Sequence, residues 1–262
     1  MKTRLDAELV RRELARSREH AADLIESRSV IVSGIPATKP ASQVDAETSI
    51  VLQGDRDDFV SRGGHKLAGA LDVFTGVEIA GRTCLDAGAS TGGFTDVLLR
   101  RGAKLVVAVD VGYGQLAWEL RQDARVKILD RTNIRHLSGD LISEDIDLVV
   151  ADLSFISLSL VLPALAAVSR PDADFVLMVK PQFEVGRENL GAGGVVRDPA
   201  LRRAAVLDIA ESAYDVGLGT LGIAASPLPG PAGNVEYFLW LRRGAPEINA
   251  QALDDAIAAG PE

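Results

Sequence analysis

The sequence predicts an α/β protein in which a doubly wound, mostly parallel sheet ends in an antiparallel hairpin and follows a small α+β module. Three observations carry this prediction. Apolar strand segments alternate with helical segments from residue 60 onward, a glycine-rich turn joins the first of these strands to a helix, and the last two strands have only a short loop between them. The chain has 262 residues and a hydrophobic content of 47%, which is enough for one large and one small domain.

The first domain is expected over residues 1–53. Apolar residues recur at helical spacing over 5–14, and a second helix is expected over 17–26 with Ser17 as its N-cap. Short alternating segments then predict strands over 30–32, 35–37 and 49–52. Such a module is too small to hold much core by itself.

The polar stretch 54–60 is expected to be a linker, and residues 61–262 are expected to form the second domain. In that domain, strands are expected near 83–87, 104–109, 125–129, 146–151, 173–179, 219–225 and 235–241. Helices are expected near 64–74, 93–101, 115–121, 158–168 and 199–216. Because the strands are almost wholly apolar, the sheet should be covered on both faces.

The turn after the strand at 83–87 consists of small residues and contains neither lysine nor arginine. The Gly-Lys-Ser/Thr signature of a phosphate loop is therefore absent. The next strand ends in Asp110, where a carboxylate can accept hydrogen bonds from both hydroxyls of a ribose. These features indicate a nucleoside cofactor and favour S-adenosylmethionine over NAD.

Composition excludes several other classes of site. The single cysteine, Cys84, rules out a disulfide framework, and the three histidines lack metal-ligand spacing, so no metal is expected. No apolar run is long enough to cross a membrane, and the first residues are charged, so we expect a soluble, cytoplasmic protein without membrane insertion. The net charge is −9, yet residues 1–39 hold eight basic and six acidic side chains. This local excess suits a polyanion, although ion pairs along a solvated helix would give the same pattern.

Four ionisable residues are expected at the ends of strands or in a helix beside the cofactor crevice: Lys66, Asp152, Lys180 and Glu236. Each has a structural alternative: an exposed helix lysine for Lys66, a helix cap for Asp152, and an edge-strand surface residue for Glu236. Lys180 is harder to explain structurally, because it ends an uninterrupted apolar strand and precedes a proline. Together the two amines and two carboxylates suit the activation of a ribose hydroxyl, which is a very weak acid.

These residues, together with the segment Leu85-Asp86-Ala87-Gly88-Ala89-Ser90-Thr91-Gly92-Gly93-Phe94-Thr95, resemble the FtsJ-like ribose 2′-O-methyltransferases. Within them the chain is most similar to the TlyA, or haemolysin A, family of ribosomal RNA cytidine methyltransferases. The segments Ser61–Leu67, Asp110–Leu116, Asp152–Leu158, Lys180–Gly186 and Ser226–Phe238 support the resemblance. The N-terminal module resembles an S4 RNA-binding domain, so the resemblance covers nearly the whole chain.

The resemblance implies a Rossmann-like methyltransferase domain whose catalytic tetrad is Lys66, Asp152, Lys180 and Glu236, with Lys180 as the central amine. The cofactor, S-adenosylmethionine, would contact Asp86, Gly88, Ala89, Ser90, Thr91, Gly92, Gly93, Phe94, Asp110, Val111, Asp130 and Asp152. The RNA would contact Arg4, Arg16, Arg18, Lys39 and Phe155, although a single aromatic such as Phe155 more often packs in a core. The implied partner is 16S or 23S ribosomal RNA in ribosomal subunits or the 70S ribosome, with an influence on capreomycin and viomycin susceptibility.

One departure from the family concerns the expected linker. Related mycobacterial proteins have Arg-x-Trp-Val there, whereas this chain has Asp57-Asp58-Phe59-Val60. Two other functions stay open at this point: a membrane-active haemolysin, and an RNA-binding protein whose methyltransferase domain is inactive. The absence of an apolar span argues against the first, and the intact tetrad argues against the second.

Overall fold

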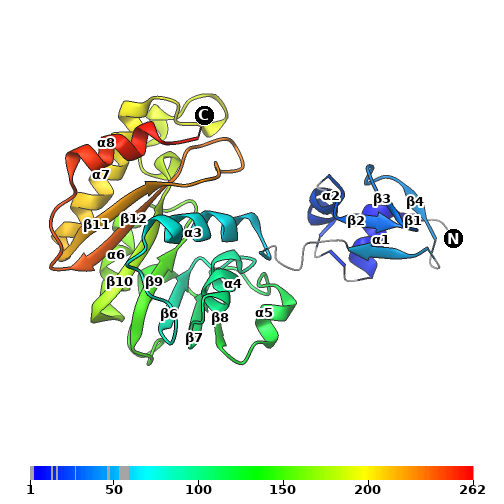
Figure 1. Ribbon diagram of the computed structural model, residues 1–262, viewed down its shortest axis with the longest axis horizontal. Helices are drawn as coiled ribbons and strands as arrows, with labels where there is room; N and C mark the ends of the chain where they lie inside the picture. Colours follow the sequence, from blue (N-terminus) through cyan, green and yellow to red (C-terminus); the bar gives the residue numbers. More distant parts are fainter. Residues whose placement is uncertain are drawn as a thin grey trace. The chain divides into compact units, whose positions relative to one another are not determined.

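The structure is a computed structural model that describes residues 3–12, 14–15, 17–26, 28–45, 48–52 and 59–261. The chain divides into two compact units, Met1–Asp58 and Phe59–Glu262, and Figure 1 includes both. Most of the expected linker lies outside the described residues. The finer limits expected from composition, 1–53, 54–60 and 61–262, therefore stay a prediction.

The described residues of the smaller unit form two helices and two small sheets. The helices are α1 (Leu5–Arg11) and α2 (Arg18–Glu26), and the strands are β1 (Thr3–Arg4), β2 (Val30–Val32), β3 (Ile35–Pro36), β4 (Gln43–Val44) and β5 (Ile50–Leu52). β2 pairs with both β3 and β5 in antiparallel fashion, and β1 pairs with β4. The hydroxyl of Ser17 accepts a hydrogen bond from the His20 amide at 3.1 Å, as expected for the N-cap of α2.

The larger unit is built on a seven-stranded sheet with the order β11-β12-β10-β9-β6-β7-β8. The strands are β6 (Thr83–Ala87), β7 (Leu105–Val109), β8 (Val126–Leu129), β9 (Ile146–Ala151), β10 (Ser169–Val179), β11 (Leu218–Ala225) and β12 (Tyr237–Arg243). β12 runs antiparallel to both of its neighbours, whereas β6 to β10 run parallel. The chain order reverses between β6 and β9, which is where open α/β sheets bind ligands.

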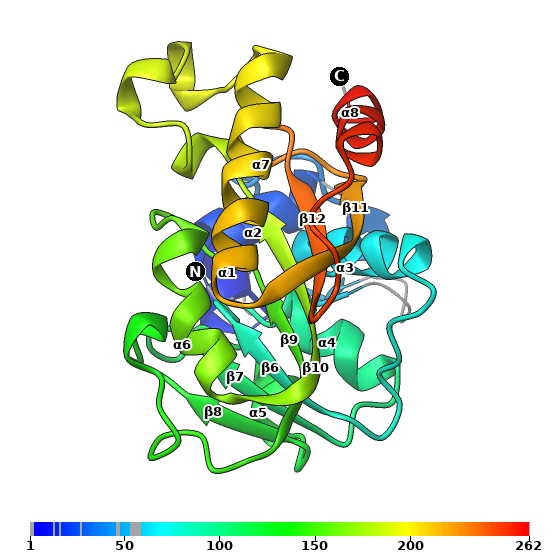
Figure 2. The same cartoon turned by 90° about the vertical axis from the view of Figure 1, so that its left-hand side faces the viewer.

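Helices cover both faces of this sheet (Figure 2). The α-helices are α3 (Arg62–Val73), α4 (Gly93–Arg100), α5 (Trp118–Gln122), α6 (Leu162–Ala167), α7 (Pro199–Asp215) and α8 (Ala250–Ala258). Short 3-10 turns are η1 (Ile134–His136), η2 (Leu158–Leu160), η3 (Pro181–Phe183), η4 (Arg187–Asn189) and η5 (Ala192–Gly194). Successive residues of one strand enter different cores: Cys84 packs with α3 to α5, while Leu85 packs with α6 to α8. The alternation expected for a sheet covered on both sides is therefore present.

The structure differs from the sequence-based expectation in a few elements. The helix expected over 158–168 is divided into η2 and α6, because Pro163 opens the first turn of α6. The helix expected over 115–121 begins only at Trp118. α8 was not expected, and β1 and β4 were missed because two-residue strands carry no periodic pattern.

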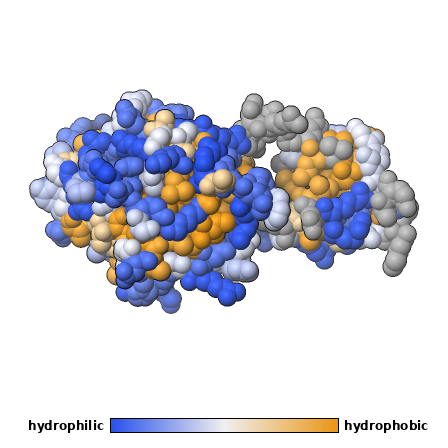
Figure 3. Space-filling model, turned by 90° about the horizontal axis from the view of Figure 1, so that it is seen from below, coloured by the Kyte–Doolittle hydropathy of each residue, from blue (hydrophilic) through white to orange (hydrophobic). Residues whose placement is uncertain are grey.

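In the part of the chain that the structure describes, no helix has the length and apolar character that crossing a bilayer requires. Among the same residues, no group of histidine, cysteine or carboxylate side chains has the arrangement of a metal site. Figure 3 shows apolar areas bordered by hydrophilic residues on the visible face of the larger unit. Exposed apolar patches with a polar rim commonly mark interaction sites.

Candidate active site

The glycine-rich turn after β6 brings the backbone close to the end of β9. Gly88 has a φ of +87°, and a Cβ at this position would lie 2.6 Å from the carbonyl oxygen of Asp152. Gly92, with a φ of +97°, precedes the first residue of α4. Only glycine fits the turn at Gly88 without moving the neighbouring strand, because a side chain there would be strained and would also meet backbone.

Asp86 lies beneath this turn and is fully buried. Its Oδ2 accepts a hydrogen bond from the Thr95 hydroxyl at 2.6 Å, and its Oδ1 has no partner among the described residues. Burial raises the pKa of the Asp86 carboxyl to about 7, although the Thr95 hydroxyl opposes part of the rise. Near neutral pH this side chain can therefore hold or release a proton.

Asp110 follows β7, and its side chain is hydrogen-bonded to the backbone of the same turn. Its two oxygens accept hydrogen bonds from the Ser90 amide at 2.8 Å and the Gly112 amide at 2.7 Å. A cavity of about 390 Å³ opens beside it, lined by Gly88, Ser90, Asp110, Val111, Gln115, Asn133, Ile134, Asp152, Leu153, Ser154, Phe155, Ile156 and Val161. A smaller cavity of about 100 Å³ is lined by Ser61, Gly63, Gly88, Ala89, Ser90, Thr91, Gly93, Phe94 and Asp152.

Most of the expected cofactor residues line one of these two cavities, but three do not. Asp86 and Gly92 support the turn instead, and Asp130 pairs with Arg121 at 3.4 Å and accepts a hydrogen bond from the Gly114 amide. Sequence reasoning missed Asn133, whose side chain accepts a hydrogen bond from the Arg135 amide. An Asn placed shortly after a strand end is a turn signal, and that signal was available in the sequence.

The structure joins Lys66 and Glu236 in a buried ion pair. Lys66 Nζ lies 2.5 Å from Glu236 Oε2, and the two residues are 7% and 1% exposed. Lys66 lies on α3, and Glu236 immediately precedes β12. Neither residue fits its structural alternative, because an exposed helix lysine and an edge-strand surface carboxylate would both be in water.

Lys180 and Asp152 form a second ion pair, at 2.5 Å between Nζ and Oδ1. They follow β10 and β9, which are parallel neighbours, so their side chains meet at the carboxyl edge of the sheet. Asp152 does not cap a helix; the turn η2 is capped by Ser157 instead. Asp152 lines both cavities, and Lys180 is therefore held next to the cofactor crevice.

Two residues that sequence reasoning missed contact the ion pairs. The Ser154 hydroxyl accepts a hydrogen bond from Lys180 Nζ at 3.0 Å, and Gln182 donates a hydrogen bond from Nε2 to Glu236 Oε1 at 3.4 Å. Both lie within two residues of a tetrad member. Proximity in sequence was the available signal, but small polar residues are too common near strand ends for it to single them out.

Phe155 is 91% exposed and does not pack in the core, contrary to the commoner fate of a single aromatic. Its φ is +64°, an unusual conformation for a bulky residue, and its ring centroid lies 5.2 Å from that of Phe183. It lines the larger cavity beside Ser154. The backbone therefore holds an aromatic ring in solvent beside Phe183, whose ring centroid lies 6.0 Å from Lys180 Nζ.

The comparison with protein families identifies the larger unit. Residues 59–243 match the family described as FtsJ-like methyltransferase. The chain belongs to this family. Residues 3–50 match the S4 domain. The resemblance expected from the sequence, including the Rossmann-like sheet with its antiparallel C-terminal strand, is confirmed.

Relatives extend over almost the whole of this methyltransferase. The 16S/23S rRNA (cytidine-2′-O)-methyltransferase TlyA of Mycobacterium tuberculosis is 57% identical over 258 residues, covering 98% of this chain and 96% of the relative. The 23S rRNA (cytidine-2′-O)-methyltransferase TlyA of Campylobacter jejuni is 31% identical, covering 86% and 93%. A solved protein from Streptococcus thermophilus that carries the name hemolysin has a TM-score of 0.78 and 38% identity, covering 98% and 94%.

The basic residues of the S4 unit of this methyltransferase are partly engaged with acids. Arg4 and Arg18 both pair with the buried Asp6, at 2.8 and 3.0 Å, and these bonds hold the pKa of the Asp6 carboxyl far below its usual range. Lys39 is exposed, and Arg16 lies outside the described residues. The ion pairs expected along these helices are therefore present, and the interpretation of the segment as a polyanion-binding surface stays a prediction.

Proposed function

We propose that this methyltransferase transfers a methyl group from S-adenosylmethionine to the ribose 2′-hydroxyl of cytidines in ribosomal RNA. The observation that supports the proposal is the Lys180–Asp152 ion pair, whose Asp152 lines the crevice, together with the buried Lys66–Glu236 pair before the strand that pairs with β10. The relatives from Mycobacterium tuberculosis and Campylobacter jejuni, whose names state this reaction, support it.

The residues around the larger cavity fit S-adenosylmethionine. Gly88 lines both cavities and lets the turn lie close against the Asp152 backbone, and the Asp110 oxygens keep lone pairs for two ribose hydroxyls after accepting their backbone hydrogen bonds. A volume of about 390 Å³ is in the range of small-molecule sites. Asp110 would hold the ribose, and the turn from Gly88 to Gly93 would hold the methionine part. When bound, the cofactor supplies an electrophilic methyl group.

Lys180 acts on the substrate hydroxyl in this proposal. Asp152 and Ser154 fix its Nζ at the crevice, where it can hold the ribose oxygen and stabilise the negative charge that develops as the proton leaves. The Lys66–Glu236 pair adds a second amine and carboxylate where β12 begins beside the end of β10, and Gln182 donates a hydrogen bond to Glu236. Because methyl transfer needs in-line approach, holding the hydroxyl in one position supplies a large part of the rate.

The S4 unit and Phe155 are proposed to bind the RNA. Arg4, Arg18 and Lys39 offer donors to phosphates, and the exposed ring of Phe155 is available for stacking on an unpaired base. We propose that the RNA is recognised in ribosomal subunits or the intact ribosome. Both relatives' names include 23S rRNA, so 23S is the first substrate to test.

Tritium transfer from labelled S-adenosylmethionine to purified ribosomal subunits tests the proposal. We expect label in RNA with the wild type, in positions that resist alkaline cleavage because the 2′-hydroxyl is blocked, and none with Lys180→Ala. Label that persists in Lys180→Ala would remove the catalytic assignment. Dye leakage from lipid vesicles without the cofactor, and no labelled RNA, would instead support the membrane-active function.

A further inference from the structure

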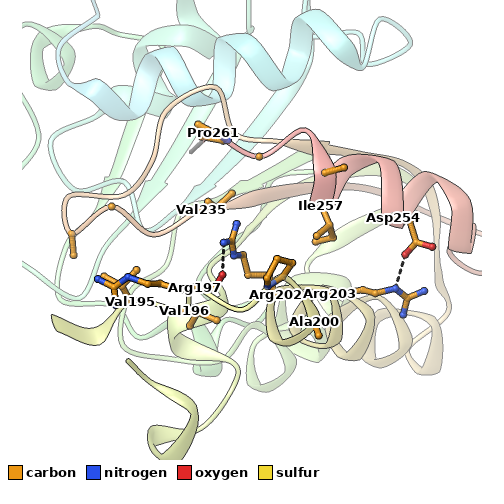
Figure 4. A pocket seen from close by; sticks show the side chains of 15 residues that line it. Val195, Val196, Arg197, Ala200, Arg202, Arg203, Val235, Asp254, Ile257 and Pro261 are labelled. Atoms are coloured by element: carbon orange, nitrogen blue, oxygen red, sulfur yellow. Dashed lines mark hydrogen bonds and ion pairs between the residues drawn. The ribbon is translucent and has the colours of Figure 1, made fainter. Parts of the chain in front are cut away.

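A cavity of about 880 Å³ lies apart from the cofactor crevice, between the start of α7, the end of α8 and the loop that precedes α7 (Figure 4). Its walls combine apolar side chains with three arginines, Arg197, Arg202 and Arg203. Asp254 is the one carboxylate among its lining residues. The cavity is therefore locally basic in a chain whose net charge is −9.

The three arginines differ in how they are engaged. Arg203 pairs with Asp254 at 2.6 Å, and Arg202 donates a hydrogen bond to the Arg197 carbonyl oxygen at 2.6 Å; Figure 4 shows both contacts. The Arg197 side chain is exposed, and no ion pair is found for it within the described part of the chain. An unpaired guanidinium at the rim presents a planar fork of donors that matches phosphate.

Two polar groups lie at or near the wall of the cavity. Arg202 lines it, and Tyr237 is completely buried; burial raises the pKa of the Tyr237 phenol, and Arg202 lies close enough that its guanidinium lowers that pKa in part. Tyr237 shares a side of its strand with Val235, which lines the cavity, and a Cβ added at the lining residue Gly260 would lie 3.3 Å from the Tyr237 hydroxyl. A guanidinium and a phenol hydroxyl placed together beside apolar side chains offer hydrogen-bonding groups to a polar ligand.

The cavity shares a segment with the catalytic tetrad. Val235 lines the cavity, and the next residue is Glu236, which pairs with Lys66. Asn234 fastens this segment to the loop before α7, because its side chain accepts a hydrogen bond from the Val196 amide at 2.9 Å and donates one to the Gly194 carbonyl at 3.0 Å. A ligand in the cavity would therefore contact the residue that immediately precedes Glu236 in the chain.

We propose that this cavity binds a nucleotide of the substrate RNA other than the methylated one, with its phosphate at Arg197 and Arg202 and its sugar and base against the apolar wall. This inference rests on the proposed function. Apolar walls beside arginines suit a nucleotide better than a bare phosphate, and the volume far exceeds that of a phosphate alone. RNA is favoured over a free mononucleotide because the cavity adjoins the segment that carries Glu236.

Binding to 23S rRNA fragments or subunits is measured over a series of salt concentrations. We expect Arg197→Glu to weaken affinity about tenfold at low salt and to lower the slope of log K against log salt by about one, because one phosphate contact is lost. Arg197→Lys should recover most of the affinity. Ala200→Trp, which fills the cavity without changing charge, should weaken affinity by a similar factor and leave the slope unchanged. In methyl transfer, the effect of Arg197→Glu should fall on KM rather than kcat.

Lys104→Glu is the matched control, because it makes the same charge change at the amino edge of the sheet. Equal affinity and slope for Arg197→Glu and Lys104→Glu, with Ala200→Trp also unaffected, would overturn the proposal. A second result would also overturn the proposal: the wild type binds 5′-CMP, and Arg197→Glu abolishes that binding but leaves RNA affinity unchanged. The cavity would then be a site for a free mononucleotide. A wild type that methylates no RNA defeats the proposed function instead, and this outcome is distinct from the others.

Discussion

Lys66 and Glu236 stand 170 positions apart in the chain, yet their side chains form a buried ion pair with 2.5 Å between Nζ and Oε2. Lys66 belongs to the helix before the first strand of the sheet, and Glu236 precedes its last strand. The pair thus ties together the two ends of the methyltransferase unit at the rim of the site. Because both groups are almost completely buried, each depends on the other for compensation of its charge.

Glu236→Gln should therefore destabilise the methyltransferase unit by about 3 kcal/mol, because removing one partner of a buried pair leaves an uncompensated charge. The double variant Lys66→Met/Glu236→Leu should recover most of that stability, while methyl transfer stays lost. Urea unfolding followed by circular dichroism gives the stability, and tritium transfer gives the activity. If Glu236→Gln unfolds at the same urea concentration as the wild type, the Lys66–Glu236 pair is hydrated in solution.

Ser154→Ala should act on the reaction without acting on the fold. The variant removes the hydroxyl that accepts a hydrogen bond from Lys180 and leaves the ion pair to Asp152 in place. We expect kcat to fall about tenfold, with a displaced pH–rate profile and little change in KM, since loss of one positioning hydrogen bond costs about 1 to 1.5 kcal/mol. A merely structural role for Ser154 would lower the unfolding midpoint and leave the pH profile where it is. Ser159→Ala, in the nearby turn η2, is the control.

Sequence alone predicted those parts of the structure that depend on local pattern. The turn around Gly88 was recognised because strand, small residues and helix follow one another within a dozen positions. Helix α8 also had local signals, an Asn249 cap and Leu253 and Ala256 on one face, and these were overlooked. The elements that local pattern did not reveal were the shortest ones, such as β1 and β4.

The partners within the site could not be predicted, because they depend on crossover connections. The sequence indicated four charged residues near one crevice, but which amine meets which carboxylate follows from β9 and β10 being neighbours and from α3 reaching the start of β12. The cavity at Arg197 was missed for the same reason. Its arginines and Tyr237 come from segments whose proximity is set by packing rather than by spacing.

Asp86 should make stability depend on pH. Its pKa is about 7 in the folded protein because of burial, against 3.8 for the ordinary group. Below pH 4 it is protonated in both states. Between pH 4 and 7 the unfolded chain is ionised while the folded protein keeps its proton, so stability falls as pH rises, and above pH 7 the loss is constant.

Asp86→Asn removes this dependence. Relative to the variant, the wild type should lose about 2 kcal/mol of unfolding free energy between pH 5 and pH 7. Urea titrations of both proteins at each pH measure the difference, in which all other titrating groups cancel. Thr95→Val should extend the loss to higher pH, because the hydroxyl that lowers the Asp86 pKa is gone. A difference that does not vary with pH would mean that Asp86 is ionised throughout.

Phe155→Asn should separate RNA recognition from stability. The exposed ring contributes little burial, and Asn adopts a positive φ more readily than Phe, so the unfolding midpoint should not fall. Stacking on a base is worth about 1 to 3 kcal/mol, so kcat/KM for RNA should fall about 5- to 150-fold. Phe155→Trp, which keeps an aromatic face, should retain activity within about threefold. Cofactor affinity, measured by calorimetry, separates this effect from a change in the cavity that Phe155 also lines. If Phe155→Asn loses cofactor affinity in proportion to activity, the ring acts on the cofactor, and the base-stacking assignment is wrong.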